Sequence, residues 1–243
     1  TIKKYKMVNV NTVYQTVLAL ANKEQRGYIT PQEFNLFANQ AQMEIFEQYF
    51  YDLNQFKRVP GNDANETDMV ALIDDKVSIF NETDILSNVG SEDGNNKYIL
   101  PTNFYRLVDV RTGKSHANVH VNKLSRKEFW EANQAPLTKG TEKRPNFYMH
   151  KKEILVNGLK AYQDNSIYLN YLRKPSMTKW GYVVVGEKPL YAGSRSTDFE
   201  LHDSEQKDLV IKILQLAGIS IKDYNVAQVA GQKEANTVQQ EKS

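Results

Sequence analysis

The segment from Asn22 to Glu33 carries oxygen-bearing side chains at the spacing of a calcium-binding loop. In an EF-hand, Asn22, Glu24 and Arg26 would occupy the first three side-chain ligand positions. Gly27 would form the turn, and Glu33 would be the bidentate ligand at the end of the loop. Arginine offers no oxygen to a cation, so this pattern is a poor calcium site. A calcium-responsive regulatory module is therefore kept as an alternative function.

The same segment also fits a corner between two helices. Gly27 can end the first helix in the left-handed conformation, and Thr30 and Glu33 form a Thr-x-x-Glu capping box for the second. Ile29 and Phe34 then have the positions of a hydrophobic staple. Because the corner gives most of these residues a structural role, we expect no metal site here.

The four histidines are the next residues with possible chemistry. His116 and His120 are four apart, as in a zinc pair on a helix, but they lead into an expected strand. Four strand residues span about 13 Å, which is too far for one shared ion. His150 and His202 are distant in sequence, so a catalytic triad can be neither built nor excluded. Phosphate-binding and dinucleotide-binding glycine motifs are missing, and we expect no catalytic residue, metal or cofactor.

The composition narrows the class of protein. The chain has 243 residues, with 31 basic and 29 acidic side chains, so there is no general attraction to nucleic acid or to an anionic membrane. It has no cysteine, which fits synthesis in a reducing cytoplasm. The start, Thr1–Asn11, lacks the apolar run of an export signal, and no 18-residue apolar run exists, so no membrane association is expected.

Helical periodicity dominates the first part of the chain. We expect one helix from a cap near Asn11 to about Asn22, and a long second helix from Pro31 to near Arg58. The second helix has one apolar stripe that begins at Phe34. A second stripe on another face has no evident partner within the chain, which predicts an oligomer interface; it consists of Met43, Phe46 and Phe50. The many Asn and Gln residues of the helices also suit surfaces buried against other subunits.

The rest of the chain predicts an α+β fold with an antiparallel β-sheet or sandwich inserted between helical parts. A third helix is expected over 67–80, an acidic loop over 81–96, and a short helix over 126–133. A C-terminal helix starts at Asp203 and ends at Gly218, before an extended tail. The expected strands are 97–100, 105–111, 119–121, 147–150, 154–156, 167–172 and 182–185. Three parts follow: an N-terminal helical hairpin region (1–80), a β domain (81–200), and C-terminal helices with a tail (201–243).

Two weaker binding signals lie in the β region. A glycan-binding or hydrolytic tail component is a second alternative function, since four aromatic residues could stack on sugars: Tyr148, Tyr168, Tyr171 and Trp180. Basic clusters beside aromatic residues allow incidental, non-specific contact with DNA phosphates.

The order of helical hairpin, β insert and C-terminal helices resembles the head-to-tail connector or ring proteins of short-tailed bacteriophages, including tail tubular A-type adaptors and the ring proteins of crAss-like phages. The residues that carry the resemblance are Val13–Asn22, Gly27–Phe34, Gln40–Phe46, Leu100–Leu107, Tyr171–Pro175 and the helix after Phe199–Leu201.

The resemblance implies a structural virion protein, not an enzyme, that is assembled in the host cytoplasm. It implies a homo-oligomeric ring, usually of twelve copies, that docks under the portal protein, contacts other tail ring or nozzle proteins, and continues the DNA channel into the tail. In this family the C-terminal segment commonly reaches the portal. The portal-docking residues implied for this chain are Tyr224, Val226, Val229 and Val238.

Overall fold

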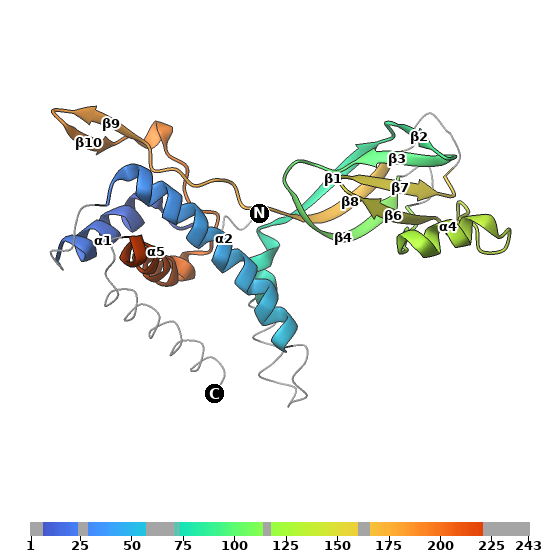
Figure 1. Cartoon of the computed structure of the whole chain (residues 1–243), viewed down its shortest axis with the longest axis horizontal. Coiled ribbons are helices and arrows are strands. Elements are labelled where there is room, and N and C mark those ends of the chain that lie inside the picture. The colour runs from blue at the N-terminus through green and yellow to red at the C-terminus, as the bar shows by residue number, and fades with distance from the viewer. Residues whose placement is uncertain are drawn as a thin grey trace. The chain divides into compact units, whose positions relative to one another are not determined.

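The computed structural model describes residues 7–23, 29–56, 71, 73–113, 118–159 and 166–220. It is a mixed α+β fold of helices and mostly antiparallel sheets (Figure 1). The chain forms two compact units: a helical unit, made of residues 1–79 and 175–243, and a β unit, made of residues 80–174. This differs from the expected three-part division, because residues 175–200 belong to the helical unit and both ends of the chain contribute to that unit.

Three helices build the helical unit: α1 (Val10–Lys23), α2 (Pro31–Phe56) and α5 (Gln206–Ser220). Asn9, not Asn11, caps α1, since its side-chain oxygen accepts hydrogen bonds from the backbone N–H groups of Asn11 and Thr12. Both α1 and α2 pack on α5. A helical stretch over 73–78 adds buried Ile73 and Val77.

The apolar residues of α2 are buried within its own chain. Phe46 is completely buried and Phe50 is 9% exposed, and their rings meet edge to face at 5.0 Å. Met43 is half-buried. The premise that made Met43, Phe46 and Phe50 an oligomer interface is therefore wrong for Phe46 and Phe50, because these two side chains are buried within the chain itself.

The C-terminal helix begins after a short 3-10 turn, η3 (Asp203–Glu205), whose cap is His202. Gly218 does not end α5, which continues to Ser220. The periodicity of this helix predicts an apolar face of Leu209, Val210, Ile213, Leu214 and Ala217; all of these are buried except Leu214, which is half-buried. The tail after Ser220 lies outside the described residues, and so do the four expected portal-docking residues: Tyr224, Val226, Val229 and Val238.

The β unit contains two sheets around a shared core. The three-stranded sheet has the order β1 (Asn81–Ser87), β8 (Ser166–Arg173), β4 (Phe104–Thr112). The five-stranded sheet has the order β2 (Gly90–Glu92), β3 (Asn95–Ile99), β7 (Glu153–Asn157), β6 (Asn146–His150), β5 (Asn122–Lys123). All pairs are antiparallel except β5 with β6. Tyr98, Val156, Leu169 and Tyr171 show that both sheets contribute to one apolar core.

The acidic loop expected over 81–96 is instead two strands, β1 and β2, with the start of a third. Asp93 and Gly94 both have positive φ, 51° and 76°, as a tight hairpin turn between β2 and β3 requires. An Asp-Gly turn signal was therefore present, but the many polar residues around it obscured the alternation of the strands. The short helix α4 (Arg126–Gln134) forms as expected, with a capping box between Ser125 and Glu128.

A separate two-stranded sheet belongs to the helical unit: β9 (Tyr182–Val185) and β10 (Lys188–Tyr191), followed by the 3-10 turn η2 (Gly193–Arg195). We call residues 182–191 the β9–β10 arm. In Figure 1 it extends away from α1, α2 and α5 of the same unit. None of the described helices is long and apolar enough to cross a membrane.

Candidate interaction site

Side-chain amides of α2 hold the chain segment that leads into the β9–β10 arm. Asn35, Asn39 and Gln42 lie on one face of α2, at helical spacing. Asn35 donates to the carbonyl of Trp180 at 3.2 Å and accepts from the Trp180 N–H at 2.7 Å. Asn39 makes the same reciprocal pair with the backbone of Thr178, both at 2.8 Å.

Gln42 extends this row of amides by one step. It donates to the carbonyl of Ser176 at 2.8 Å, and its oxygen accepts from the Thr178 hydroxyl at 3.1 Å and from the Glu200 N–H at 3.0 Å. The three amides therefore act towards residues 176–180 as the edge of a neighbouring strand would. Three of the Asn and Gln residues of α2, which were expected to suit surfaces buried against other subunits, are thus bonded within the chain.

Trp180 fixes the base of the arm. It is 3% exposed, its ring stacks on Tyr14 at 4.0 Å, and its indole N–H donates to Asn11 at 3.1 Å. Tyr182 and Tyr191, the first and last residues of the arm, lie 5.7 and 6.0 Å from the same ring. The arm thus starts from an aromatic cluster that is anchored on α1.

Close packing leaves no room for a side chain next to Trp180. A Cβ atom on Gly181 would collide with the backbone carbonyl of Arg195. The Gly181 N–H also donates to the Ser196 hydroxyl at 2.9 Å, and its carbonyl accepts from the Ala192 N–H at 2.9 Å. The two chain segments at the base of the arm are therefore held tightly together.

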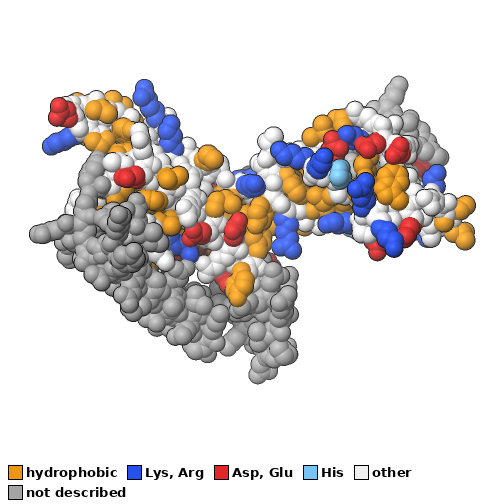
Figure 2. All heavy atoms as spheres, in the orientation of Figure 1, with side chains coloured by type: hydrophobic (Ala, Val, Ile, Leu, Met, Phe, Trp, Pro, Cys, Tyr) orange, Lys and Arg blue, Asp and Glu red, His pale blue; other side chains and the backbone are white. Residues whose placement is uncertain are grey.

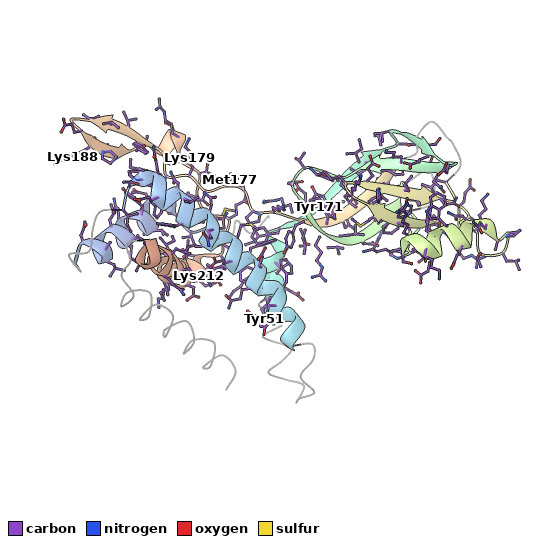
Figure 3. All side chains as sticks on the ribbon, viewed as in Figure 1. Tyr51, Tyr171, Met177, Lys179, Lys188 and Lys212 are labelled. Carbon is purple, nitrogen blue, oxygen red and sulfur yellow. The ribbon has the colours of Figure 1, made fainter. Side chains whose placement is uncertain are left out.

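The strands of the arm expose apolar side chains. Val184 is 62% exposed, Val185 57% and Leu190 53%. Figure 2 shows hydrophobic side chains over the arm with charged side chains at its end, and Figure 3 places Lys188 there and Lys179 nearer its base. Single exposed apolar residues are common, but a cluster on a projecting hairpin indicates a surface that binds another protein.

The turn of the arm is tightly specified. Gly186 and Glu187 both have positive φ, 55° and 66°, which is the type I′ geometry of a two-residue hairpin. Since a two-stranded hairpin alone is marginally stable in water, the arm depends on its anchored base. This arrangement presents a preformed surface rather than a flexible loop.

Glu33, the last ligand position of the calcium-type segment, has another role in the structure. Glu33 accepts from the Thr30 backbone N–H at 2.9 Å and from its hydroxyl at 2.8 Å, and these bonds lower the pKa of Glu33. The capping box is thus confirmed, and Ile29 and Phe34 are buried beside it. Glu24 to Tyr28 lie outside the described residues. Among the described residues, no group of three metal-binding side chains is found.

Two of the described histidines, His120 and His202, make local contacts. His120 is 63% exposed, as expected for a surface residue, and its Nδ1 lies 2.6 Å from Asp109. Burial raises the pKa of Asp109, but hydrogen bonds from Arg111 and His120 outweigh burial and hold it below its ordinary value. His202 Nδ1 accepts from the Ser204 N–H at 3.2 Å, which is a helix-cap contact. His116 lies outside the described residues.

Most of the aromatic residues expected to stack on sugars are not accessible. Tyr148 is 4% exposed, Tyr171 1% and Trp180 3%, while Tyr168 is half-buried. These rings belong to apolar cores, so they cannot form a sugar platform. Burial raises the pKa of Tyr171, whose hydroxyl donates to Asp84 at 2.9 Å.

A cavity of about 830 Å³ lies in the β unit beside α4. Trp130, Lys139 and Asn157 are among its lining residues, and Asn157 Nδ2 donates to Asn95 at 2.6 Å. Both side-chain polar atoms of Asn133 are buried without a hydrogen-bond partner. The lining also includes Asp93, Lys143 and Leu159, so it combines charged, amide and apolar side chains and does not by itself indicate one class of ligand or a reaction.

In comparisons with known proteins, no family model and no curated protein matches the chain. The most prominent surface feature of the described residues is thus an anchored hairpin with exposed apolar side chains.

Proposed function

We propose that the chain is a structural subunit of a ring in the head-to-tail connector of a short-tailed bacteriophage. In this proposal it docks to the portal protein, contacts other tail ring or nozzle proteins, and continues the DNA channel into the tail. The observation that carries it is the β9–β10 arm, an exposed apolar hairpin held on α2 by reciprocal amide hydrogen bonds. The resemblance of the sequence to connector proteins supplies the kind of assembly.

In this proposal the chain has a structural role in an assembly and catalyses no reaction. An N-terminal helical hairpin, a β insert of sandwich type and a C-terminal tail are the parts of such a subunit, with α1 and α2 as the hairpin. The tail, with Tyr224, Val226, Val229 and Val238, is proposed to dock on the portal. Affinity in a ring of about twelve copies would come from repetition of a modest interface around a closed circle.

The alternatives have less support in the site. A calcium-responsive module would use Glu33, whose carboxylate is engaged in a capping box. A glycan-binding component would use aromatic rings that are mostly buried. Calcium should stabilise the protein in the first case, and glycans should bind in the second; the connector proposal expects neither effect.

The proposal is tested by native mass spectrometry of the purified chain, alone and co-expressed with a portal protein. A closed oligomer, or a monomer that assembles only on the portal, supports it. A monomer that ignores the portal contradicts it.

A further inference from the structure

Among the described residues, neither strand of the β9–β10 arm pairs with a third strand, but only β9 has a backbone N–H available for such pairing at the centre of its outer edge. In a two-residue type I′ hairpin the residues that flank the turn, Val185 and Lys188, exchange hydrogen bonds. Hydrogen-bonded and non-bonded pairs alternate from there. The alternation makes Val183 and Leu190 a hydrogen-bonded pair, and Gly181 and Ala192 the next one. The bond from the Ala192 N–H to the Gly181 carbonyl agrees with this pattern.

Val184 and its partner Pro189 are therefore a non-bonded pair, whose backbone groups point outward. Proline has no N–H, so the outer edge of β10 is blocked at its centre. The outer edge of β9 keeps both the N–H and the carbonyl of Val184, and Val183, Val184 and Val185 are all exposed. The arm thus has one edge protected against pairing and one edge open to it.

A matching open edge exists on β1. The bond from the Arg173 N–H to the Phe80 carbonyl sets the alternation between β1 and β8, so Thr83 and Ile85 are non-bonded positions with outward backbone groups. β1 is the edge strand of its sheet among the described residues, contains no proline, and carries Ile85 at 60% exposure.

Charge also favours this pairing. The arm and its base carry Lys179, Lys188 and Arg195 against one acid, Glu187. The β1–β2 region carries four acids, Glu82, Asp84, Glu92 and Asp93, with no lysine or arginine between Asn81 and Gly94. A second arm of the same kind would meet like charge instead, which disfavours symmetric pairing of two arms.

We propose that β9 of one copy adds as an extra strand to β1 of the next copy, which rests on the proposed ring function and names the contact that builds the ring. Strand addition of this kind gains affinity from main-chain hydrogen bonds and specificity from the side chains beside them. Each copy then uses two different surfaces, one for each neighbour, and such head-to-tail contacts close into rings.

The absence of cysteine from the sequence makes disulfide trapping a direct test. Paired strands bring Cα atoms within the distance that a disulfide spans. Val184→Cys is combined with Ile85→Cys and, for the neighbouring register, with Thr83→Cys. We expect one combination to give, on mild oxidation, a ladder of covalent multimers that extends beyond the dimer. Val184→Cys with Val108→Cys is the matched control, since Val108 is 59% exposed on β4, and it should give no ladder.

The other outcomes overturn the inference. A dimer from Val184→Cys alone means that two arms pair with each other, and a species that remains at the monomer mass after complete oxidation means pairing within one copy. Native mass spectrometry of the reduced variants separates the proposed ring function from the proposed β9–β1 contact. If the variants form a ring but no combination cross-links on oxidation, only the β9–β1 contact is refuted. If the protein is a monomer that does not bind the portal, both proposals are refuted.

A second pair of variants tests the backbone bond itself. Val184→Pro removes the outward N–H at a position whose cross-strand partner is already a proline, and Val184→Thr keeps it. We expect the proline variant to lose assembly at least tenfold while its melting temperature stays close to that of the threonine variant. Equal assembly of the two variants would contradict strand addition at β9.

Discussion

The row of amides on α2 makes a prediction that can be worked out from the hydrogen bonds. Asn39→Ala removes the reciprocal pair with Thr178, a residue that is only 2% exposed. Two bonds at about 1 kcal/mol each, with a further penalty for buried peptide groups left unpaired, give a destabilisation of about 2–4 kcal/mol. At about 2–4 °C per kcal/mol for a chain of this size, the melting temperature should fall by about 4–16 °C.

The assay is differential scanning calorimetry, with limited trypsin digestion as a local measure. Lys179, beside Thr178 and exposed, should be cleaved faster in the Asn39→Ala variant, because the segment that leads into the arm is released. Gln40→Ala is the control: Gln40 is exposed on the same helix and bonds only to Glu44 among the described contacts. The reasoning fails if Asn39→Ala and Gln40→Ala have the same melting temperature and the same cleavage rate.

Three further predictions concern stability. Lys76→Met removes the ion pair at 2.6 Å to Glu205, a residue that is only 5% exposed, and should lower the free energy of unfolding measured by urea titration by about 3 kcal/mol. Lys127→Met is the control, because it removes an exposed ion pair and should lower the same free energy by less than about 0.5 kcal/mol. Gly181→Ala should lower the melting temperature, because the new Cβ meets the Arg195 backbone; an unchanged value would contradict this. The pKa of Glu33 in the folded state is lowered from its ordinary value of 4.5. The ionised Glu33 side chain therefore stabilises the fold above that pH, and this stabilisation is lost as the pH falls. Glu33→Gln should accordingly make the stability depend less on pH on the acid side.

The sequence predicted the structure best where a feature depends only on residues close together in the chain. The capping box of Thr30 and Glu33 and the core residues of α5, such as Ile213, follow from side-chain types at fixed spacing. The mixed α+β class follows from the change of period after the helices. These features depend on neighbours in the chain, so a single sequence contains the necessary information.

The sequence was misleading where a distant segment supplies the partner. The sequence near Phe46 and Phe50 does not show what covers them, and only the fold places α5, more than 150 residues later, against α2. A test by Phe46→Asp would therefore unfold the helical unit instead of separating subunits.

The candidate site was missed for a similar reason. Asn35, Asn39 and Gln42 have helical spacing, but nothing in the sequence connects them to residues 176–180. The hairpin itself left a signal: Gly186-Glu187 separates Tyr182–Val185 from a second short run that ends at Tyr191. Expecting a strand over 182–185 without its partner left the arm unrecognised.

The mass of the native protein tests the central claim most directly. A subunit of 27.9 kDa that forms a connector ring should appear in native mass spectrometry as one closed species near twelve times that mass, alone or on a co-expressed portal, and Val184→Pro should reduce it to the monomer. A wild-type chain that remains a monomer at every concentration, with or without the portal, would contradict the account.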